Sequence, residues 1–541
     1  MCHKGGDVLW NNFVDELLAL KLHFWLLPPS LSCCCLPLSS FFKKRKIRVK
    51  KLRSIGRITT LEKALSNPCT YGVHLTEFNR GEFVMSTSGA IASLDAFLHR
   101  WKAKAGNYTG DYITTPEGLV RNNMDDEQGR GGYYQEYACT SESQVMMARG
   151  YLRAYQATGE SRYLQNARTA MQALIRYFFF GKVPSTATAW RSHWIVNAGA
   201  PFKSKENGRT TDTIAFGEAY ECWPTWRKLR PNEFATAGDS MHWFIENFHL
   251  FSQLETEDQK GQWLAARDAM FREFKLLLSP KWQAKYKGAI PFEYTNKGDN
   301  LTVRSTSIFR GPYYTGYQNP LPWLYMQDYT AAANMLQLLV ESQVAYTKST
   351  GVKGPFAPVY HYDASLLGSA KKNVFTWNGP DPNTFWGGFQ YRPFADVAHF
   401  WYHCKRSNIQ NAAVSNASKV CMSFLSWLDG WLTAHPNNEY VPTEFREATQ
   451  PSAPPANGDN DPHMIALALK GALFCKNAGA DAAMVGRVIA RLYAMVMKRQ
   501  SKAGDMAGAF MHDPYSHIFK GFWAGDIMEA LALYIMHHEK G

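Results

Sequence analysis

Residues 141–178 carry the clearest periodic pattern in the chain. Within residues 145–155, apolar and aromatic side chains recur at spacings of three and four, which is typical of a helix with one buried face. Gly159 can take the left-handed conformation that ends a helix, and Ser161 can cap the helix that follows. The same spacing continues through residues 164–178. The stretch therefore predicts a hairpin of two helices.

The rest of the chain repeats this plan. Further helices are expected at 88–104, 232–250, 258–278, 328–346, 393–404, 411–432, 462–476, 481–499 and 517–537, with a shorter helical piece at 213–222. Long aromatic loops rich in glycine and proline separate the helices, and neither a strand-rich domain nor a Gly/Ser linker is evident. Pairs that bury one face only against their neighbours are typical of helical repeats and toroids. Six pairs sharing the 457 residues from Met85 onward would take about 76 residues each.

The first 84 residues have a different character. Residues 17–42 are apolar, but a lysine, a histidine and several prolines interrupt them, so a membrane-spanning helix is not expected. The basic run at 43–51 follows this segment, whereas a secretory signal has its basic residues first. Codons for residues 80–82 can be almost all purine, as in a bacterial ribosome-binding site upstream of Met85. We expect residues 1–84 to be a leader that is disordered or not translated, and residues 85–541 to form the domain.

Much of the net charge of +13 lies in this leader. Residues 1–84 carry 13 Lys and Arg against 6 Asp and Glu, a net charge of +7, which leaves +6 for the remaining 457 residues. A nucleic-acid partner is therefore not expected, because that hypothesis depends on a single tail. The residual positive charge modestly favours an acidic polymer.

The ten cysteines show no ligand or pairing pattern. Half of them lie in the first 84 residues, and the others are scattered without a CxxC pair or zinc-finger spacing. Neither a disulfide framework nor a structural zinc site is expected. Synthesis in the cytoplasm is the simplest expectation, with association with a virion as a further possibility.

A family resemblance follows from the hairpin. Residues 151–159 (Tyr-Leu-Arg-Ala-Tyr-Gln-Ala-Thr-Gly) with residues 162–167 (Arg-Tyr-Leu-Gln-Asn-Ala) resemble the repeat of the six-hairpin glycosidase superfamily. This resemblance implies an all-α (α/α)6 toroid, with its cleft at the end where loops lead into the inner helices. The superfamily contains many glycoside hydrolases and polysaccharide lyases. Separately, residues 354–360 and 377–384 are similar to uncharacterised proteins of tailed-phage structural modules.

Glycoside hydrolysis generally needs two carboxyl groups, one protonated and one ionised. Glu142 follows a glycine-rich loop and several tyrosines, in the first turn of a predicted helix. Residues 140–142 also resemble the Ser-Glu-Gly start of the helix that bears the general acid in family 8 glycosidases, although Ser143 replaces the glycine here. A first-turn glutamate is favoured by the helix dipole in any case. Glu142 is our expected acid, with Asp461 or Asp381 as its partner.

The two partner candidates have simpler alternatives. Asp461 precedes Pro462, as an ordinary N-cap does, and Asp381 lies in an Asp-Pro-Asn turn. A calcium site at residues 125–127 would need further ligands that the sequence does not show, so no metal and no cofactor are expected. The acidic residues at 212, 218 and 221 are expected to be solvated.

Aromatic residues in loops suit the stacking of sugar rings. The expected substrate-binding residues are Trp223, Trp226, Trp377, Trp386, Tyr391, Arg392 and Trp523. Arg392 could hold a carboxylate, and the His-rich segment 512–517 could supply a base, so a lyase acting on a uronate polymer is an alternative to the hydrolase. A third alternative is a glycan-binding virion or surface component without activity. The expected partner is thus a polysaccharide or oligosaccharide, with no nucleic acid and no membrane, and the sequence does not fix the oligomeric state.

Overall fold

The computed structural model describes fourteen stretches of the chain, beginning at Met85. They are 85–100, 113–121, 138–178, 195–206, 209–221, 227–229, 238–290, 294–297, 300–303, 312–363, 372–377, 384–452, 462–511 and 519–540. Residues 85–541 form one compact unit by their internal contacts. Residues 1–84, which were expected to be a leader, lie outside the described residues, so that expectation stays a prediction.

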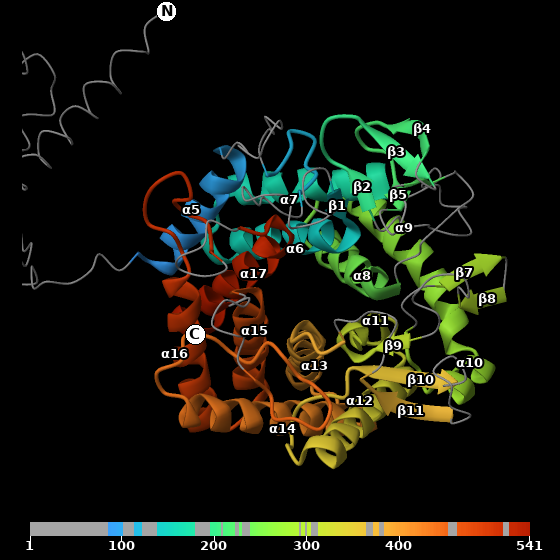
Figure 1. Ribbon diagram of the computed structural model, residues 1–541, viewed down its shortest axis with the longest axis vertical. Helices are drawn as coiled ribbons and strands as arrows, with labels where there is room; N and C mark the ends of the chain where they lie inside the picture. The colour runs from blue at the N-terminus through green and yellow to red at the C-terminus, as the bar shows by residue number, and fades with distance from the viewer. Residues whose placement is uncertain are drawn as a thin grey trace, which may run out of the picture. The chain divides into compact units, whose positions relative to one another are not determined.

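Six helices of the described chain form a closed inner ring. They are α6 (Ser141–Thr158), α8 (Gly238–Ser252), α11 (Leu321–Tyr325), α13 (Gly388–Arg406), α15 (Pro462–Ala478) and α17 (Ala524–Tyr534). Each packs against the next in this order, and α17 closes the ring on α6. Figure 1 shows these helices gathered around the centre of the molecule.

Each inner helix packs against an outer helix. For five of them the outer helix is the next one in the sequence, whereas α17 packs against α5 at the start of the unit. The outer helices are α5 (Thr87–Arg100), α7 (Ser161–Ala173), α9 (Glu257–Phe274), α12 (Tyr329–Thr350), α14 (Ala412–Ala434) and α16 (Ala482–Lys498). The pairs are α6 with α7, α8 with α9, α11 with α12, α13 with α14, α15 with α16, and α17 with α5. The fold is therefore the (α/α)6 toroid expected from the sequence.

Burial distinguishes the two layers. In the outer helix α16, the buried residues recur at helical spacing on one face, for example Val485, Val488 and Leu492. In the inner helix α15, residues 462–475 are buried on every side. An inner helix is therefore enclosed all around by its neighbours, which places charged side chains that face the ring axis away from water.

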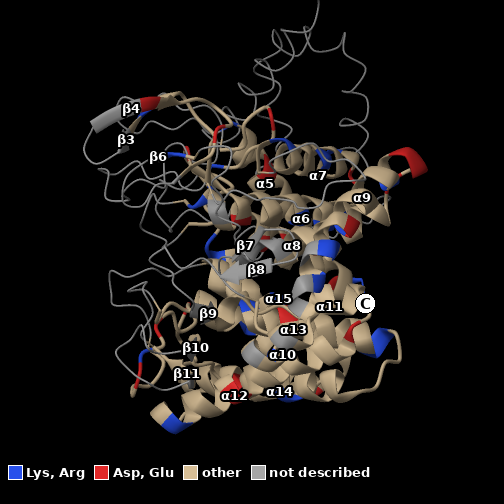
Figure 2. Ribbon diagram, turned by 90° about the vertical axis from the view of Figure 1, so that its right-hand side faces the viewer, with Lys and Arg blue, Asp and Glu red and all other residues tan. Residues whose placement is uncertain are grey.

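The inner helices begin after long loops that carry the short strands. These are β1 (Ala138–Thr140), β2 (Ile195–Asn197), β3 (Phe202–Glu206), β4 (Arg209–Ile214), β5 (Tyr220–Glu221), β6 (Arg227–Lys228), β7 (Tyr294–Lys297), β8 (Asn300–Val303), β9 (Pro312–Tyr314), β10 (Val359–Asp363) and β11 (Lys372–Thr376). All their pairings are antiparallel: β1–β2, β3–β4, β5–β6, β7–β8 and a three-stranded sheet in the order β11-β10-β9. Figure 2 shows most of them along one side of the molecule.

Short helical elements complete the described chain. They are the α-helix α10 (Pro280–Tyr286), the 3₁₀-helices η5 (Lys275–Leu278), η6 (Thr315–Tyr317) and η8 (Gly521–Trp523), and the π-helices η4 (Leu174–Phe178) and η9 (Ile535–Glu539). None of the described helices is both long and apolar enough to span a bilayer.

One predicted helical piece is wrong. Residues 213–222 were expected to be helical, but Thr213 and Ile214 end strand β4 and pair with Lys203 and Phe202. Gly217 then takes a left-handed conformation (φ 80°), and the chain re-enters an extended strand at Tyr220. β-Branched residues suit the pleated pairing, so the cross-strand partners decide this segment rather than its helical spacing.

Candidate functional site

The N-terminal ends of four inner helices bring together a cluster of buried ionisable side chains. Glu142 lies in the first turn of α6, Arg392 near the start of α13, His463 in the first turn of α15, and Asp526 in the first turn of α17. Local sequence fixes these helix starts: Thr140 caps α6 by accepting a hydrogen bond from the Ser143 backbone N–H (3.1 Å), and Pro462 occupies the first position of α15. The cluster lies at the ring end where the long loops enter.

Glu142 is ion-paired with Arg392 inside the ring. A carboxylate oxygen of Glu142 contacts a terminal nitrogen of the Arg392 guanidinium, and each side chain is only 2% exposed. Burial raises the pKa of Glu142 to about 7, because the charge of Arg392 only partly offsets the loss of water and the negative charge of Asp526 adds to the shift. Glu142 therefore exchanges its proton near neutral pH, as a general acid must.

Asp526, in contrast, stays ionised at neutral pH. Its Oδ2 lies 3.0 Å from Nε2 of His463, and both side chains are fully buried. Burial alone would raise the pKa of Asp526, but His463, Lys470 and Arg149 outweigh it and lower the pKa to about 2. Burial lowers the pKa of His463 to about 4, so at neutral pH an uncharged imidazole donates its Nε2–H to an ionised Asp526.

Aromatic rings surround these charges. The Arg392 guanidinium lies over the rings of Trp386 at 4.9 Å, Trp243 at 5.6 Å and Tyr317 at 5.7 Å. The imidazole of His463 is nearly parallel to the ring of Trp523, with ring centres 5.0 Å apart. Trp386 and Trp523 are partly exposed, so at this end of the ring two indoles adjoin the buried charges and reach solvent.

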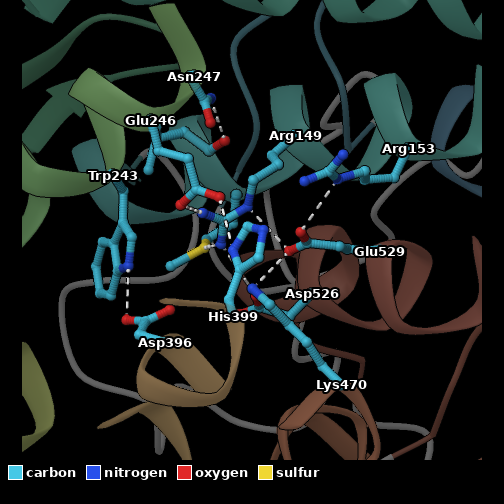
Figure 3. Close-up of polar contacts among 12 residues, drawn as sticks. Arg149, Arg153, Trp243, Glu246, Asn247, Asp396, His399, Lys470, Asp526 and Glu529 are labelled. Atoms are coloured by element: carbon cyan, nitrogen blue, oxygen red, sulfur yellow. Dashed lines mark hydrogen bonds and ion pairs between the residues drawn. The ribbon is translucent and has the colours of Figure 1, made fainter. Parts of the chain in front are cut away.

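A second layer of charges fills the ring axis beneath this cluster (Figure 3). Arg149 of α6 is its hub: Nε lies 2.9 Å from Oε2 of Glu529, and a terminal nitrogen lies 2.5 Å from Oε2 of Glu246. The Lys470 ammonium contacts the same oxygen of Glu529 at 2.9 Å. Opposite charges thus alternate across α6, α8, α15 and α17, which compensates each buried charge with a close partner.

This layer continues toward α13. His399 of α13 places Nδ1 3.2 Å from Oε1 of Glu246, and Asp396 accepts a hydrogen bond of 3.2 Å from the Trp243 indole N–H. Burial raises the pKa of Asp396 to about 7 against the opposing charges of Lys470 and Arg149. Since Trp243 also lies over Arg392, one indole connects this lower layer to the cluster above it.

Four of the residues expected from the sequence are brought together here. Glu142, Arg392, Trp386 and Trp523 all lie within the cluster at the start of the inner helices. Lys520 adds a positive charge beside them, with its ammonium 4.4 Å from the centre of the Trp523 ring. Their convergence joins segments that are far apart in sequence.

Two expected stacking residues lie in the core. The indole N–H of Trp377 donates to the Phe445 carbonyl (3.0 Å), and the Tyr391 hydroxyl donates to the Pro442 carbonyl (2.9 Å). Tyr391 is 0% exposed and Trp377 is 8% exposed. Their side chains pack against Tyr346 and Phe445, and the candidate site does not include them.

The remaining candidates either lie outside the described residues or are acids on the strands β4–β6 and the turn between them. Asp381, Asp461, Trp223 and Trp226 lie outside the described residues, as do the acidic segment 125–127 and the segment 512–517. Asp212 is exposed, and Glu218 is ion-paired with Lys228 on the neighbouring strand. Both agree with the expectation that these acids are solvated.

Asp526, His463 and Trp243 were not identified from the sequence. Asp526 was placed well inside a helix expected at 517–537, whereas α17 begins at Ala524 and makes it a first-turn residue. A later predicted start for this helix would have placed Asp526 in a first turn and made it a candidate. His463 had none beyond its place after Asp461 and Pro462.

Metal ligation has no support among the described residues, where no group of three or more His, Cys, Asp or Glu side chains is arranged to hold an ion. Cys139, Cys404, Cys421 and Cys475 are buried free thiols. The carboxyl, imidazole and guanidinium groups of the cluster suit proton transfer and charge stabilisation.

No family model matches the chain, and no curated protein matches it. Several solved structures are similar in architecture. An α-amylase from Clostridium perfringens is 9% identical over 83% of this chain and 98% of its own, with a TM-score of 0.48. An α-1,6-mannanase from a Salegentibacter species is 10% identical over 84% and 100%, with a TM-score of 0.47. A D-mannose isomerase is 11% identical over 83% and 97%, with a TM-score of 0.49.

Proposed function

We propose that this protein is a carbohydrate-active enzyme that hydrolyses glycosidic bonds of a polysaccharide, with Glu142 as the general acid and Asp526 as its ionised partner. One observation carries the proposal. Two buried carboxyl groups lie in the first turns of the adjacent inner helices α6 and α17, and their surroundings drive their pKa values apart, to about 7 and about 2. A pair of this kind divides the acid and base roles between two carboxyls.

The roles follow from protonation. Protonated Glu142 gives its proton to the glycosidic oxygen as the bond from that oxygen to the sugar carbon breaks. Ionised Asp526 stabilises the positive charge that develops on the sugar ring, either by bonding to the sugar carbon or by taking a proton from the attacking water. Arg392 holds the Glu142 carboxylate after the proton has left, because the ion pair favours the ionised form.

The surroundings suit a sugar substrate. Trp386 and Trp523 are partly exposed and offer flat apolar surfaces next to the carboxyl pair. Substrate would reach the pair from the end where the inner helices begin, since Trp523 and Lys520 are partly exposed there. Asp381 and Asp461, the partners expected from the sequence, stay predictions and belong in the same test.

The test is a screen of the full chain against neutral and uronate polysaccharides for new reducing ends. We expect Glu142→Gln and Asp526→Asn each to reduce turnover by about 10²- to 10⁴-fold while circular dichroism stays unchanged. Glu341→Gln is the matched control. Glu341 lies on the outer helix α12, where its partly exposed carboxylate is ion-paired with Lys287. Unchanged turnover in Asp526→Asn, with loss in Asp461→Asn or Asp381→Asn, would return the partner role to those residues.

A lyase acting on a uronate polymer is the second candidate, and His463 is the observation that favours it. The imidazole is uncharged at neutral pH, and Asp526 fixes its orientation. A base that removes the proton next to a substrate carboxylate must be uncharged in this way. The Arg392 guanidinium would then neutralise the substrate carboxylate. Products separate the candidates: a lyase generates an unsaturated sugar end that absorbs ultraviolet light, whereas a hydrolase does not. Binding without any product would support the non-catalytic alternative.

A further inference from the structure

A cavity on the outer side of α6 lies apart from the carboxyl pair. It has a volume of about 250 Å³ and is lined by His99 of α5, Thr114 and Gly118 of the loop 113–121, Tyr151 of α6, and Asn166 and Thr169 of α7. Tyr151 and Glu142 are nine residues apart in the same helix, about two and a half turns, so they project from opposite faces. The cavity is thus separated from the ring axis by the α6 backbone.

The walls of the cavity are held in place by specific contacts. The Gln144 side-chain amide donates to the carbonyls of Gly118 (2.7 Å) and Ala170 (2.8 Å), and its oxygen accepts from the Val120 N–H (3.1 Å). Gly118 has a φ of 90°, and a Cβ there would lie 2.7 Å from the Thr169 carbonyl oxygen. The loop therefore lies directly on α7, and the cavity is formed before any ligand arrives.

Its polar groups are already oriented. The Tyr151 hydroxyl lies 3.0 Å from Nε2 of His99, and the Asn166 amide donates to Oδ1 of Asp95 at 3.1 Å. Asp95 is only 6% exposed and lies behind the lining, with Nε2 of His99 at 3.4 Å and Nε of Arg162 at 3.8 Å from its carboxylate oxygens. The buried Oγ1 of Thr114 lies beside the Tyr151 phenol.

These features define the class of ligand. The described lining residues include hydroxyl, amide and imidazole groups but no Lys, Arg, Asp or Glu, which favours a neutral partner with many hydroxyls. The volume equals that of about eight liquid waters, enough for one sugar ring but not for an oligosaccharide. The His99 side chain is 40% exposed, so the cavity opens to solvent.

We propose that this cavity is a second binding site, which takes a single neutral monosaccharide unit or a polyol of that size. The inference stands without the proposed hydrolase, because none of its residues belongs to the carboxyl pair. A site of this kind would anchor the end or a branch of a glycan on the outer surface of the toroid.

The test measures binding of glucose, mannose, galactose and N-acetylglucosamine to Glu142→Gln by isothermal titration and ligand-observed NMR. In that background we expect Tyr151→Phe with Asn166→Leu to weaken binding by at least about tenfold, because two hydrogen-bonding groups are removed with little change of shape. Thr169→Val provides a second lining variant. Gln165→Leu on the exposed side of α7 is the matched control and should leave affinity unchanged.

Three outcomes would overturn the inference. They are the absence of saturable binding of all four sugars, binding that Trp523→Ala abolishes while the lining variants do not, and equal affinity for glucuronate and glucose. The second outcome would place the sugar at the carboxyl pair instead. A variant that loses turnover but still binds the sugar, or that loses sugar binding but keeps turnover, shows that this inference and the proposed hydrolase can fail independently.

Discussion

Glu142 at the start of α6 is ion-paired with Arg392 at the start of α13, across the inside of the helix ring. Burial raises the pKa of Glu142, Arg392 lowers it and Asp526 adds to the rise, and the balance lies at about 7. If Glu142 is the acid, kcat/KM should fall above about pH 7 as the group loses its proton. We expect this alkaline limb in a pH profile on whichever glycan the screen identifies.

Replacing Arg392 with Met should move that limb to higher pH, because the charge that favours ionised Glu142 is lost. Trp523→Phe keeps an aromatic ring and both charges, so it should leave the position of the limb unchanged. A limb that stays in place in Arg392→Met would show that another group controls the alkaline side.

A close approach of two glycines fixes the contact between α6 and α17. A Cβ added at Gly150 would lie 2.5 Å from the Gly525 carbonyl oxygen, which is backbone and cannot give way cheaply. We expect Gly150→Ala to lower the free energy of unfolding by about 1–3 kcal/mol, measured by urea denaturation.

Gly486 of α16 provides the matched control for Gly150. It also lies inside a helix, but a Cβ there meets nothing within 4 Å. Gly486→Ala should raise stability by about 0.5–1 kcal/mol, because alanine is the better helix former. Equal effects at both glycines would contradict the close packing of α6 on α17.

The helical hairpins could be predicted because their signals are local. In α16 and α7, one apolar face and a recognisable turn define each helix within a few residues. Helix starts were harder to place: Pro393 suggested a start for α13, yet the helix begins at Gly388 and contains this proline. The short strands were missed because their pairing partners lie elsewhere in the chain.

The candidate site was only partly predictable for the same reason. Glu142 and Arg392 each stood in a suggestive local context, but nothing local indicates that they form a pair. Asp526 became a candidate only once α17 was seen to begin at Ala524. The protonation states of both carboxyls depend on burial by several helices, which a periodic pattern does not report.

Arg149 is the hub of the buried charges and should be essential to stability. Replacing it with Met leaves Glu246 without its closest cation and removes one of the two cations that contact Glu529, whose other partner is Lys470. We expect a loss of about 3–5 kcal/mol in the free energy of unfolding. Arg487→Met removes a surface ion pair with Asp429 and should have no measurable effect on urea denaturation.

A double-mutant cycle tests the cause of the Arg149 effect. Adding Glu246→Gln to Arg149→Met should recover part of the lost stability, because one uncompensated charge is removed together with its partner. Strictly additive losses would mean that Arg149 acts through packing and not through its charge.

Asp396 makes the stability of the toroid depend on pH. Its pKa is 3.8 ordinarily and about 7 in the folded chain, chiefly because burial favours the protonated form. Between these values the folded state holds a proton that the unfolded state has released, so this contribution to stability is present at low pH and is lost as the pH rises.

Asp396→Asn cannot lose a proton and mimics the protonated form. The free energy of unfolding of the wild type should therefore fall relative to the variant by about 1 kcal/mol per pH unit between pH 4 and pH 7. Buried histidines such as His463 titrate in the same window with the opposite sign, but they are common to both proteins and cancel in the difference. Urea denaturation of both proteins at several pH values measures this difference, and parallel stability curves would show that Asp396 is ionised throughout the range.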